Sequence, residues 1–243
     1  MGAYQQTYER SLSDPAGFWG DAATAIDWET PPPTVLDASN PPFYRWFTGG
    51  RLNTCANALD RHVRAGNGDR VALIYDSPIT DSARTYTYAE LTDEVSRFAG
   101  ALRSLGVGVG DRVVVYMPMV PEAAIAMLAC ARLGAVHSVV FGGFAPQELA
   151  VRIDDAEPKA VVTASCGIEP TRTIPYKPLL DKALELARHD VDHCVVLQRP
   201  QVVADMTPGR DISWSDAVAD AGPVEPVAVD ATDPLYILYT SGT

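Results

Sequence analysis

The sequence is poor in cysteine and histidine, and it has no close cysteine pairs. Its four cysteines and four histidines show neither a C-x-x-C pair nor metal-ligand spacing, which argues against a zinc site. We expect reduced, mostly buried thiols, with Cys55, Cys130 and Cys194 in apolar helices or strands and Cys166 outside them. A catalytic cysteine is the alternative, although nothing near these residues lowers a thiol pKa. His137, within an apolar strand, is interpreted as a core histidine with its hydrogen bonds satisfied.

Basic residues are also scarce. Nineteen Lys and Arg residues are outnumbered by thirty-one Asp and Glu residues, which gives a formal net charge of −12. Duplex nucleic acid and anionic membranes require clustered positive charge, so we expect neither as a partner. No basic segment followed by an apolar core begins the sequence, and its longest apolar stretch, residues 123–131, is too short to span a bilayer. We therefore expect a cytoplasmic protein that binds small molecules; the oligomeric state is left open.

Apolar strands alternate regularly with helices over most of the sequence. Hydrophobic residues make up 47% of the 243 residues, which is a globular composition able to bury a core. Strands that are apolar on both faces and separated by helices predict an α/β fold, with a mainly parallel sheet layered with helices. The predicted strands span residues 113–116, 136–141, 160–164, 194–197 and 235–239, and the predicted helices span 121–134, 146–156, 177–188 and 213–219.

The first 50 residues follow a different pattern, rich in Pro, Trp and Asp. We predict short helices at 5–12 and 15–23, and then an aromatic cluster of Phe43, Tyr44, Trp46 and Phe47. We interpret this region as an arm that packs its aromatic side chains on the main body; an anchor for a protein partner is the alternative. A helix at 54–64, a strand at 71–75 and a helix capped by Thr87 and Glu90 and ended by Gly106 connect the arm to the alternating elements.

Ligands of parallel sheets bind at the carboxyl ends of the strands, which directs attention to three segments. In the first, Gly142 and Gly143 let a ligand approach the backbone closely, or they form a tight turn between strand and helix. In the second, residues 165–172, the guanidinium of Arg172 suits a phosphate group, or it is a solvated loop arginine. In the third, residues 240–243, hydroxyl side chains around a glycine are typical of a loop that surrounds a polyphosphate.

Residues 233–243, Asp-Pro-Leu-Tyr-Ile-Leu-Tyr-Thr-Ser-Gly-Thr, resemble the start of the adenylation signature of the acyl-CoA synthetase (adenylate-forming) superfamily. Residues 43–47, 52–62 and 134–144 are similar to short-chain members, and the resemblance covers essentially the whole chain. Within this branch, residues 165–170 followed by Arg172 are closer to propionate–CoA ligases than to acetate–CoA ligases. The resemblance implies an N-terminal cap segment at residues 1–60 and an incomplete AMP-binding domain at residues 61–243, the N-terminal part of the large domain.

The resemblance also implies a reaction. In this family ATP, with Mg²⁺, and a carboxylate such as propionate give an acyl-adenylate and pyrophosphate, and CoA then displaces AMP to give propionyl-CoA. The family motif continues through Thr-Gly-x-Pro-Lys-Gly, so the loop lysine, the acyl pocket and the catalytic lysine are expected beyond Thr243. We therefore expect a fragment that is inactive alone. The alternatives are a fragment of an acetate–CoA ligase and a non-catalytic module that binds CoA or a protein partner.

Site residues follow from the same resemblance, and no metal ligand or catalytic residue is expected among them. Acetate ligases usually have a second arginine where this chain has Glu169, which makes the local charge less favourable to the phosphates of CoA. The residues implied at the CoA site are Phe141, Gly142, Gly143, Glu169, Pro170, Thr171, Arg172 and Ile174, and those implied at the ATP phosphates are Thr240, Ser241, Gly242 and Thr243.

Overall fold

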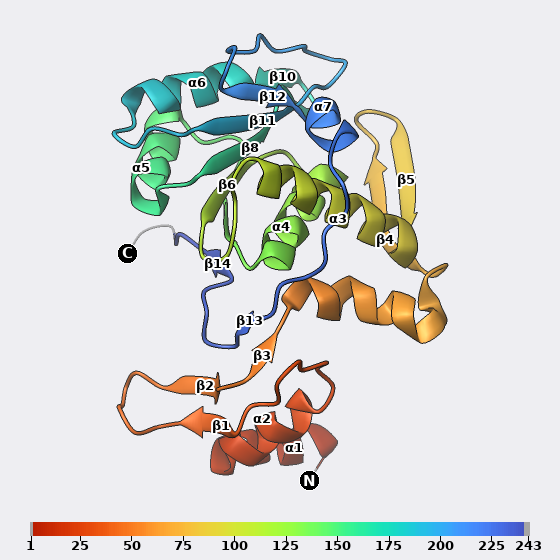
Figure 1. The fold of residues 1–243 in the computed structure, drawn as a ribbon, viewed down its shortest axis with the longest axis vertical. Helices are drawn as coiled ribbons and strands as arrows, with labels where there is room; N and C mark the ends of the chain where they lie inside the picture. The colour runs from red at the N-terminus through yellow and green to blue at the C-terminus, as the bar shows by residue number, and fades with distance from the viewer. Residues whose placement is uncertain (1, 241–243) are drawn as a thin grey trace.

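A six-stranded parallel sheet forms the centre of the structure, a computed structural model that describes residues 2–240 (Figure 1). Its strand order is β12-β11-β8-β6-β7-β14, and all neighbouring strands are parallel. This arrangement confirms the predicted α/β class. The strands are β6 (Arg112–Tyr116), β7 (Val136–Val139), β8 (Ala160–Ala164), β11 (His193–Leu197), β12 (Asp211–Ser213) and β14 (Tyr236–Ile237).

Helices cover both faces of this sheet. On one face, α3 (Tyr88–Ser104), α4 (Pro121–Leu133) and α7 (Trp214–Ala219) pack with Val113 and Val115 of β6. On the other face, α5 (Pro146–Ala156) and α6 (Tyr176–Leu186) pack with Val114 and Tyr116 of the same strand. Because successive side chains of a strand point to opposite faces, the run of apolar residues in β6 supplies both cores.

The ends of these helices lie where local sequence signals place them. Thr87 Oγ1 accepts a hydrogen bond from the backbone N–H of Glu90 at 3.2 Å, and the Glu90 carboxylate accepts one from the Thr87 N–H at 2.8 Å. This reciprocal pair is the predicted capping box of α3. Helix α4 begins at Pro121 and ends at Gly134, whose φ of 71° is in the left-handed region that favours glycine.

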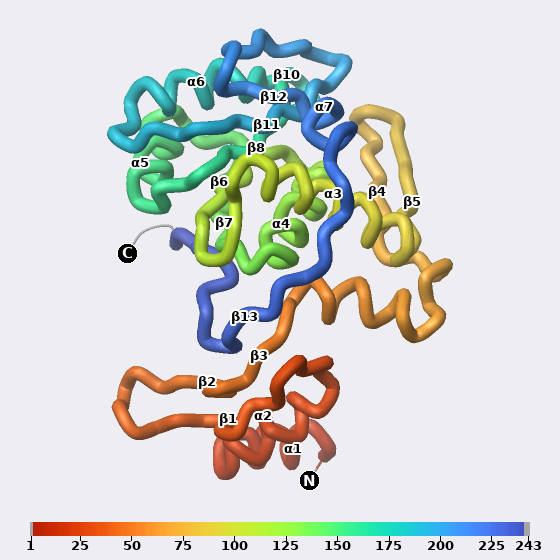
Figure 2. The backbone as a smooth tube through the Cα atoms, viewed as in Figure 1, coloured from red at the N-terminus to blue at the C-terminus, as the bar shows by residue number. Residues whose placement is uncertain are grey.

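The N-terminal region lies apart from the sheet. It contains α1 (Ala3–Ser13), α2 (Pro15–Ala23) and the antiparallel hairpin of β1 (Thr34–Asp37) and β2 (Arg45–Thr48). Strand β3 (Arg51–Leu52) pairs with β13 (Val229–Asp230), and Figure 2 shows the late segment running back to reach it. Trp46 and Phe47 pack against Trp19 and Trp28, which also belong to the N-terminal region. Phe43 and Tyr44 are exposed, contrary to prediction, because they lie in the loop that joins β1 to β2.

The connection from this region to the sheet is helical and then extended. The predicted helix at 54–64 forms but continues to Asn67, and it includes the π-helical segments η1 (Ala56–Asp60) and η2 (Val63–Asn67). The antiparallel hairpin of β4 (Val71–Ser77) and β5 (Ser82–Thr87) follows and lies beside α3 (Figure 1). Across residues 2–240, no helix is both long enough and apolar enough to cross a membrane.

Three segments near the carboxyl edge of the sheet differ from the predicted elements. Strand β7 ends at Val139 instead of residue 141, and β14 covers two residues instead of 235–239. The short β14 pairs only with His137 and Ser138 of the short β7. The segment after β8, predicted as a loop, is an antiparallel hairpin of β9 (Cys166–Glu169) and β10 (Arg172–Pro175), which turns at Pro170 and Thr171.

Candidate functional site

The carboxyl ends of β7, β6 and β8 bring the first two predicted segments together. Residues 141–144 follow β7, and the β9–β10 hairpin follows β8, with β6 between these two strands. Tyr116, the last residue of β6, donates a hydrogen bond from its hydroxyl to the carbonyl oxygen of Phe144 at 3.2 Å. Its ring also lies beside that of Tyr176, with 5.1 Å between the centroids. Tyr116 therefore lies between the two segments and contacts both sides.

Tyr176, the first residue of α6, fills the space above two glycines of this edge. A Cβ atom on Gly142 would lie 2.3 Å from a Tyr176 ring carbon, and one on Gly167 would lie 2.4 Å from its hydroxyl oxygen. Such contacts are too short for any side chain, so both positions require glycine. The structure thus gives Gly142 a packing role, which the sequence could not indicate because Tyr176 lies 34 positions further along the chain.

Two aromatic side chains, Phe141 and Phe144, flank Gly142 and Gly143 and differ in exposure. Phe141 is 72% exposed, whereas Phe144 packs against the core below α5. Their rings meet edge to face with centroids 5.9 Å apart. A Cβ atom on Gly143 would lie 2.9 Å from the Phe141 ring, so this glycine also permits the observed ring position. The segment therefore presents one exposed aromatic face that can stack on a planar group.

In the β9–β10 hairpin, Arg172, the residue predicted to bind phosphate, is paired with a carboxylate. Arg172 Nε donates a hydrogen bond to Glu169 Oε2 at 2.7 Å across the turn. This bond raises the pKa of Arg172, which stays charged. Both side chains are exposed, with Arg172 at 67%, so water weakens their attraction and Arg172 retains free N–H donors. Pro170 and Thr171 form the exposed turn, and Ile174 packs against the core from the opposite strand.

Tyr239, which directly precedes the third predicted segment, lies near Phe144 of the first, with Arg152 contacting both rings. Tyr239 donates a hydrogen bond from its hydroxyl to Asp155 of α5 at 2.6 Å, and burial with this contact raises its pKa to about 12. The guanidinium of Arg152 lies 4.7 Å from the centre of the Phe144 ring and 5.0 Å from that of Tyr239. Thr240 is exposed; the predicted phosphate-loop residues Ser241, Gly242 and Thr243 lie outside the described residues.

The thiols and His137 lack the environment of a nucleophile or base. All four cysteines are buried and unpaired with one another, including Cys166, which lies in β9 and not in a loop as expected. Burial raises the pKa of Cys55 to about 11 and that of Cys130 and Cys194 to about 12, so these thiols stay protonated near neutral pH.

His137 differs from its predicted role. Its Nδ1 is buried without a hydrogen-bond partner among the described residues, so the expectation of a satisfied core histidine is wrong. Its ring lies beside that of Tyr236 with 5.8 Å between centroids, and burial lowers its pKa, which favours the neutral form. Within residues 2–240, no group of three or more His, Cys, Asp or Glu side chains could hold a metal ion.

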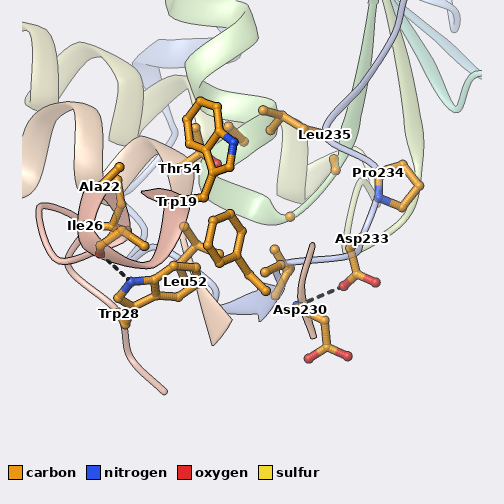
Figure 3. A pocket seen from close by; sticks show the side chains of 17 residues that line it. Trp19, Ala22, Ile26, Trp28, Leu52, Thr54, Asp230, Asp233, Pro234 and Leu235 are labelled. Carbon is orange, nitrogen blue, oxygen red and sulfur yellow. Dashed lines mark hydrogen bonds between the residues drawn. The ribbon is translucent and has the colours of Figure 1, made fainter. Parts of the chain in front are cut away.

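An apolar cavity of about 400 Å³ lies elsewhere, where the N-terminal region meets the main body (Figure 3). Gly134 and Ala135, which line it, come just before β7, so it opens near the amino end of that strand. Trp28 Nε1 donates a hydrogen bond to the carbonyl of Ala23 at its wall at 2.9 Å. Among the described residues its lining includes two aspartates, Asp230 and Asp233, and no Lys or Arg, so it does not suit an anionic ligand.

Comparison with known proteins identifies the family. Residues 59–243 match the family described as AMP-binding enzyme, and residues 4–58 match the one described as acetyl-coenzyme A synthetase N-terminus. The chain is 48% identical over 241 residues to human acyl-CoA synthetase short-chain family member 3, mitochondrial, covering 99% of this chain and 35% of that protein. It is 49% identical over 240 residues to acetyl-coenzyme A synthetase of Streptomyces avermitilis, covering 98% and 36%.

The fold agrees with this assignment. The structure superposes on acetoacetyl-CoA synthetase from Streptomyces lividans with a TM-score of 0.86 and 27% sequence identity, covering 100% of this chain and 37% of that one. The chain thus spans just over a third of the length of the relatives named above. Because the family match covers well over half of its residues, the chain belongs to the AMP-binding enzymes and resembles, within them, the N-terminal region of short-chain acyl-CoA synthetases.

Proposed function

We propose that this chain supplies the CoA-facing edge of a short-chain acyl-CoA synthetase. The observation that carries the proposal is the meeting of residues 141–144 with the β9–β10 hairpin beneath Tyr176. This edge combines an exposed aromatic ring, Phe141, with an exposed guanidinium, Arg172. CoA contains a planar adenine and several phosphates, which are the groups that such side chains bind.

Within this proposal each residue has a distinct task. Phe141 and Ile174 would contact the adenine, and Arg172 would bind a phosphate. The exposed backbone at Gly143 would let the ligand pass closely, while Gly142 makes room for the Tyr176 ring. Glu169 would weaken the binding of phosphate by Arg172, because a phosphate must compete with the existing hydrogen bond at 2.7 Å. Pro170 and Thr171 would form the turn between these two residues. CoA supplies the thiol that attacks the acyl carbonyl, and AMP leaves.

The complete synthetase would first activate its acid with ATP and Mg²⁺. The acid's carboxylate attacks the α-phosphorus and pyrophosphate leaves; Thr240 to Thr243 would begin the loop around the phosphates. We propose propionate as the acid, because residues 165–170 followed by Arg172 resemble propionate ligases. Acetate is the alternative, and the names of two of the relatives specify acetyl and acetoacetyl groups. Because the chain spans about a third of these relatives, we expect no ATP–pyrophosphate exchange with propionate from the 243-residue chain.

Isothermal titration of CoA into the purified chain tests the proposal directly. We expect binding by the wild-type chain and a loss of about tenfold or more in affinity for Arg172→Ala, because a charge-assisted phosphate contact is removed. Arg97→Ala is the matched control, since Arg97 is also exposed and also paired with a carboxylate, Asp93, but lies on α3. Absence of binding by all three proteins would reject the proposal.

A protein-binding role is favoured by one other observation. Strand β14 is at the edge of the sheet in the described part of the chain. Its Tyr236 is 55% exposed, and Leu238, which follows the strand, is 71% exposed. Exposed apolar edge strands pair with other chains or aggregate. Sedimentation velocity across a concentration series tests this role: self-association abolished by Leu238→Lys supports it, and a monomer at all concentrations rejects it.

A further inference from the structure

We propose that Lys177 and Asp211 are positioning residues for the CoA-facing edge. They are the buried pair of a four-residue ion-pair network that fixes the start of α6, and this start carries Tyr176 onto Gly142 and Gly167. The inference rests on the proposed function for its ligand. Its structural part, the ordering of the β9–β10 hairpin by the network, can be measured without any ligand.

The network joins α6 to β12 through four charged side chains. Lys177 Nζ lies 2.7 Å from Asp181 Oδ1, one turn along the helix, and 2.7 Å from Asp211 Oδ2. Arg210 bridges the same two carboxylates, at 2.6 Å from Asp181 and 2.7 Å from Asp211. The backbone N–H of Thr207 also donates a hydrogen bond to Asp211 Oδ2 at 2.7 Å. Each of the four charged side chains therefore has two partners of opposite sign.

Burial makes this network restrictive. The Lys177 side chain is 2% exposed and that of Asp211 is fully buried. A buried charge that loses its partner is strongly destabilised, so Lys177 and Asp211 can occupy only positions where they meet. Strand β12 is held in turn by parallel pairing with β11 from Cys194 to Val196. The network consequently fixes the first turn of α6 against the sheet.

Tyr176 transmits this position to the edge. It directly precedes Lys177, its N–H donates to the carbonyl oxygen of Ser165 at 3.0 Å, and its ring occupies the space above Gly142 and Gly167. Gly167 pairs with Ile174 across the hairpin. A shift of the first turn of α6 would therefore move the ring off both glycines and release the hairpin that carries Arg172.

A second anchor holds only the base of the hairpin. The backbone N–H of Arg199 donates to Ser165 Oγ at 2.8 Å, and Arg199 Nη1 donates to the carbonyl of Cys166 at 3.1 Å. These contacts stop before Gly167. We therefore expect loss of the network to loosen residues 167–174 while the base stays attached to the sheet.

Hydrogen exchange of the backbone amides tests the inference in the 243-residue chain. Lys177→Met removes the charge, and Lys182→Met is its matched control, because Lys182 is on the same helix in an exposed pair with Glu185. In Lys177→Met we expect amides of residues 167–174 to exchange about tenfold or more faster, with a much smaller change in β6 and β8. Lys182→Met should leave both groups of amides unchanged.

The affinity for CoA, measured by calorimetry, gives a second test. We expect Lys177→Met to bind CoA about tenfold more weakly than wild type, since an unpositioned hairpin must be ordered on binding. If Lys177→Met does not fold, Asp181→Asn, at the half-exposed end of the network, takes its place with a smaller expected change.

Two outcomes would overturn the inference: unchanged exchange in the hairpin, or equal acceleration throughout the chain, which would mark a purely global loss of stability. Failure of the wild-type chain to bind CoA would reject the proposed function instead. The exchange pattern would still decide whether the network positions the hairpin.

Discussion

The cavity at the N-terminal junction and the carboxyl edge of the sheet differ in shape and in chemistry. The junction cavity is lined mainly by apolar and aromatic side chains and has two aspartates at its rim. The carboxyl edge is open and presents Phe141 and Arg172 to solvent. A well-formed cavity is the usual first candidate for a ligand site. Here the two aspartates in the lining disfavour an anionic ligand, so the open carboxyl edge is the better candidate site for CoA although the junction cavity is more enclosed.

The largest effect on stability is expected at a buried ion pair near the junction. Arg132 of α4 contacts Asp60 of η1 at 2.8 and 3.0 Å and donates from Nε to the Val224 carbonyl at 2.6 Å. Arg132→Met should lower the free energy of unfolding by about 3 to 5 kcal/mol, because the Asp60 carboxylate loses its buried partner. Chemical denaturation measures this change. An Arg132→Met protein as stable as Arg97→Met would contradict it.

At the carboxyl edge, the largest effect is expected from a single methyl group. Gly142→Ala should cost about 1 to 3 kcal/mol, because its Cβ overlaps the Tyr176 ring. Gly222→Ala is the control, since a Cβ there meets no atom within 4 Å. Adding Tyr176→Ala to Gly142→Ala should cost less than the sum of the single changes. Additive costs would show that the ring does not fill this space.

A change in the junction should separate stability from binding. Trp28→Ala removes an indole that packs on Phe47 and donates to Ala23, so we expect a loss of about 2 kcal/mol in the free energy of unfolding. The affinity of the folded protein for CoA should not change. Paired denaturation and calorimetry measure both quantities. A large loss of CoA affinity would move the site toward the junction.

The converse separation is expected at Phe141. Because its ring is 72% exposed, Phe141→Ala should change the free energy of unfolding by less than about 0.5 kcal/mol. Its affinity for CoA should fall by about fivefold or more, since stacking on a base contributes about 1 kcal/mol or more. The same pair of measurements checks it, with Phe43→Ala, another exposed phenylalanine, as the control. Equal CoA affinity for both variants would remove Phe141 from the site.

The sequence predicts well what local signals determine. The capping box at Thr87 and Glu90, and the Pro121 and Gly134 boundaries of α4, depend on neighbouring residues and were all confirmed. Runs of apolar residues likewise predicted the α/β class. Local pattern does not reveal how far a strand is paired, so β14 is shorter than its apolar run.

Contacts between distant residues account for the other differences. Tyr176 meets Gly142 only because β7, β6 and β8 are neighbours in the sheet. The β9–β10 hairpin formed where a loop was predicted, and its pairing of Glu169 with Arg172 became visible only in the structure. The sequence therefore pointed to the segments of the candidate site but not to the side chain that joins them.

Hydrogen exchange with and without CoA tests most directly whether CoA binds at the carboxyl edge or at the junction cavity, because it reports on both regions in one experiment. We expect slower exchange on adding CoA in residues 141–144 and 166–174, and no change around the junction cavity at residues 229–235. Slower exchange at the junction, with none at the carboxyl edge, would contradict this expectation.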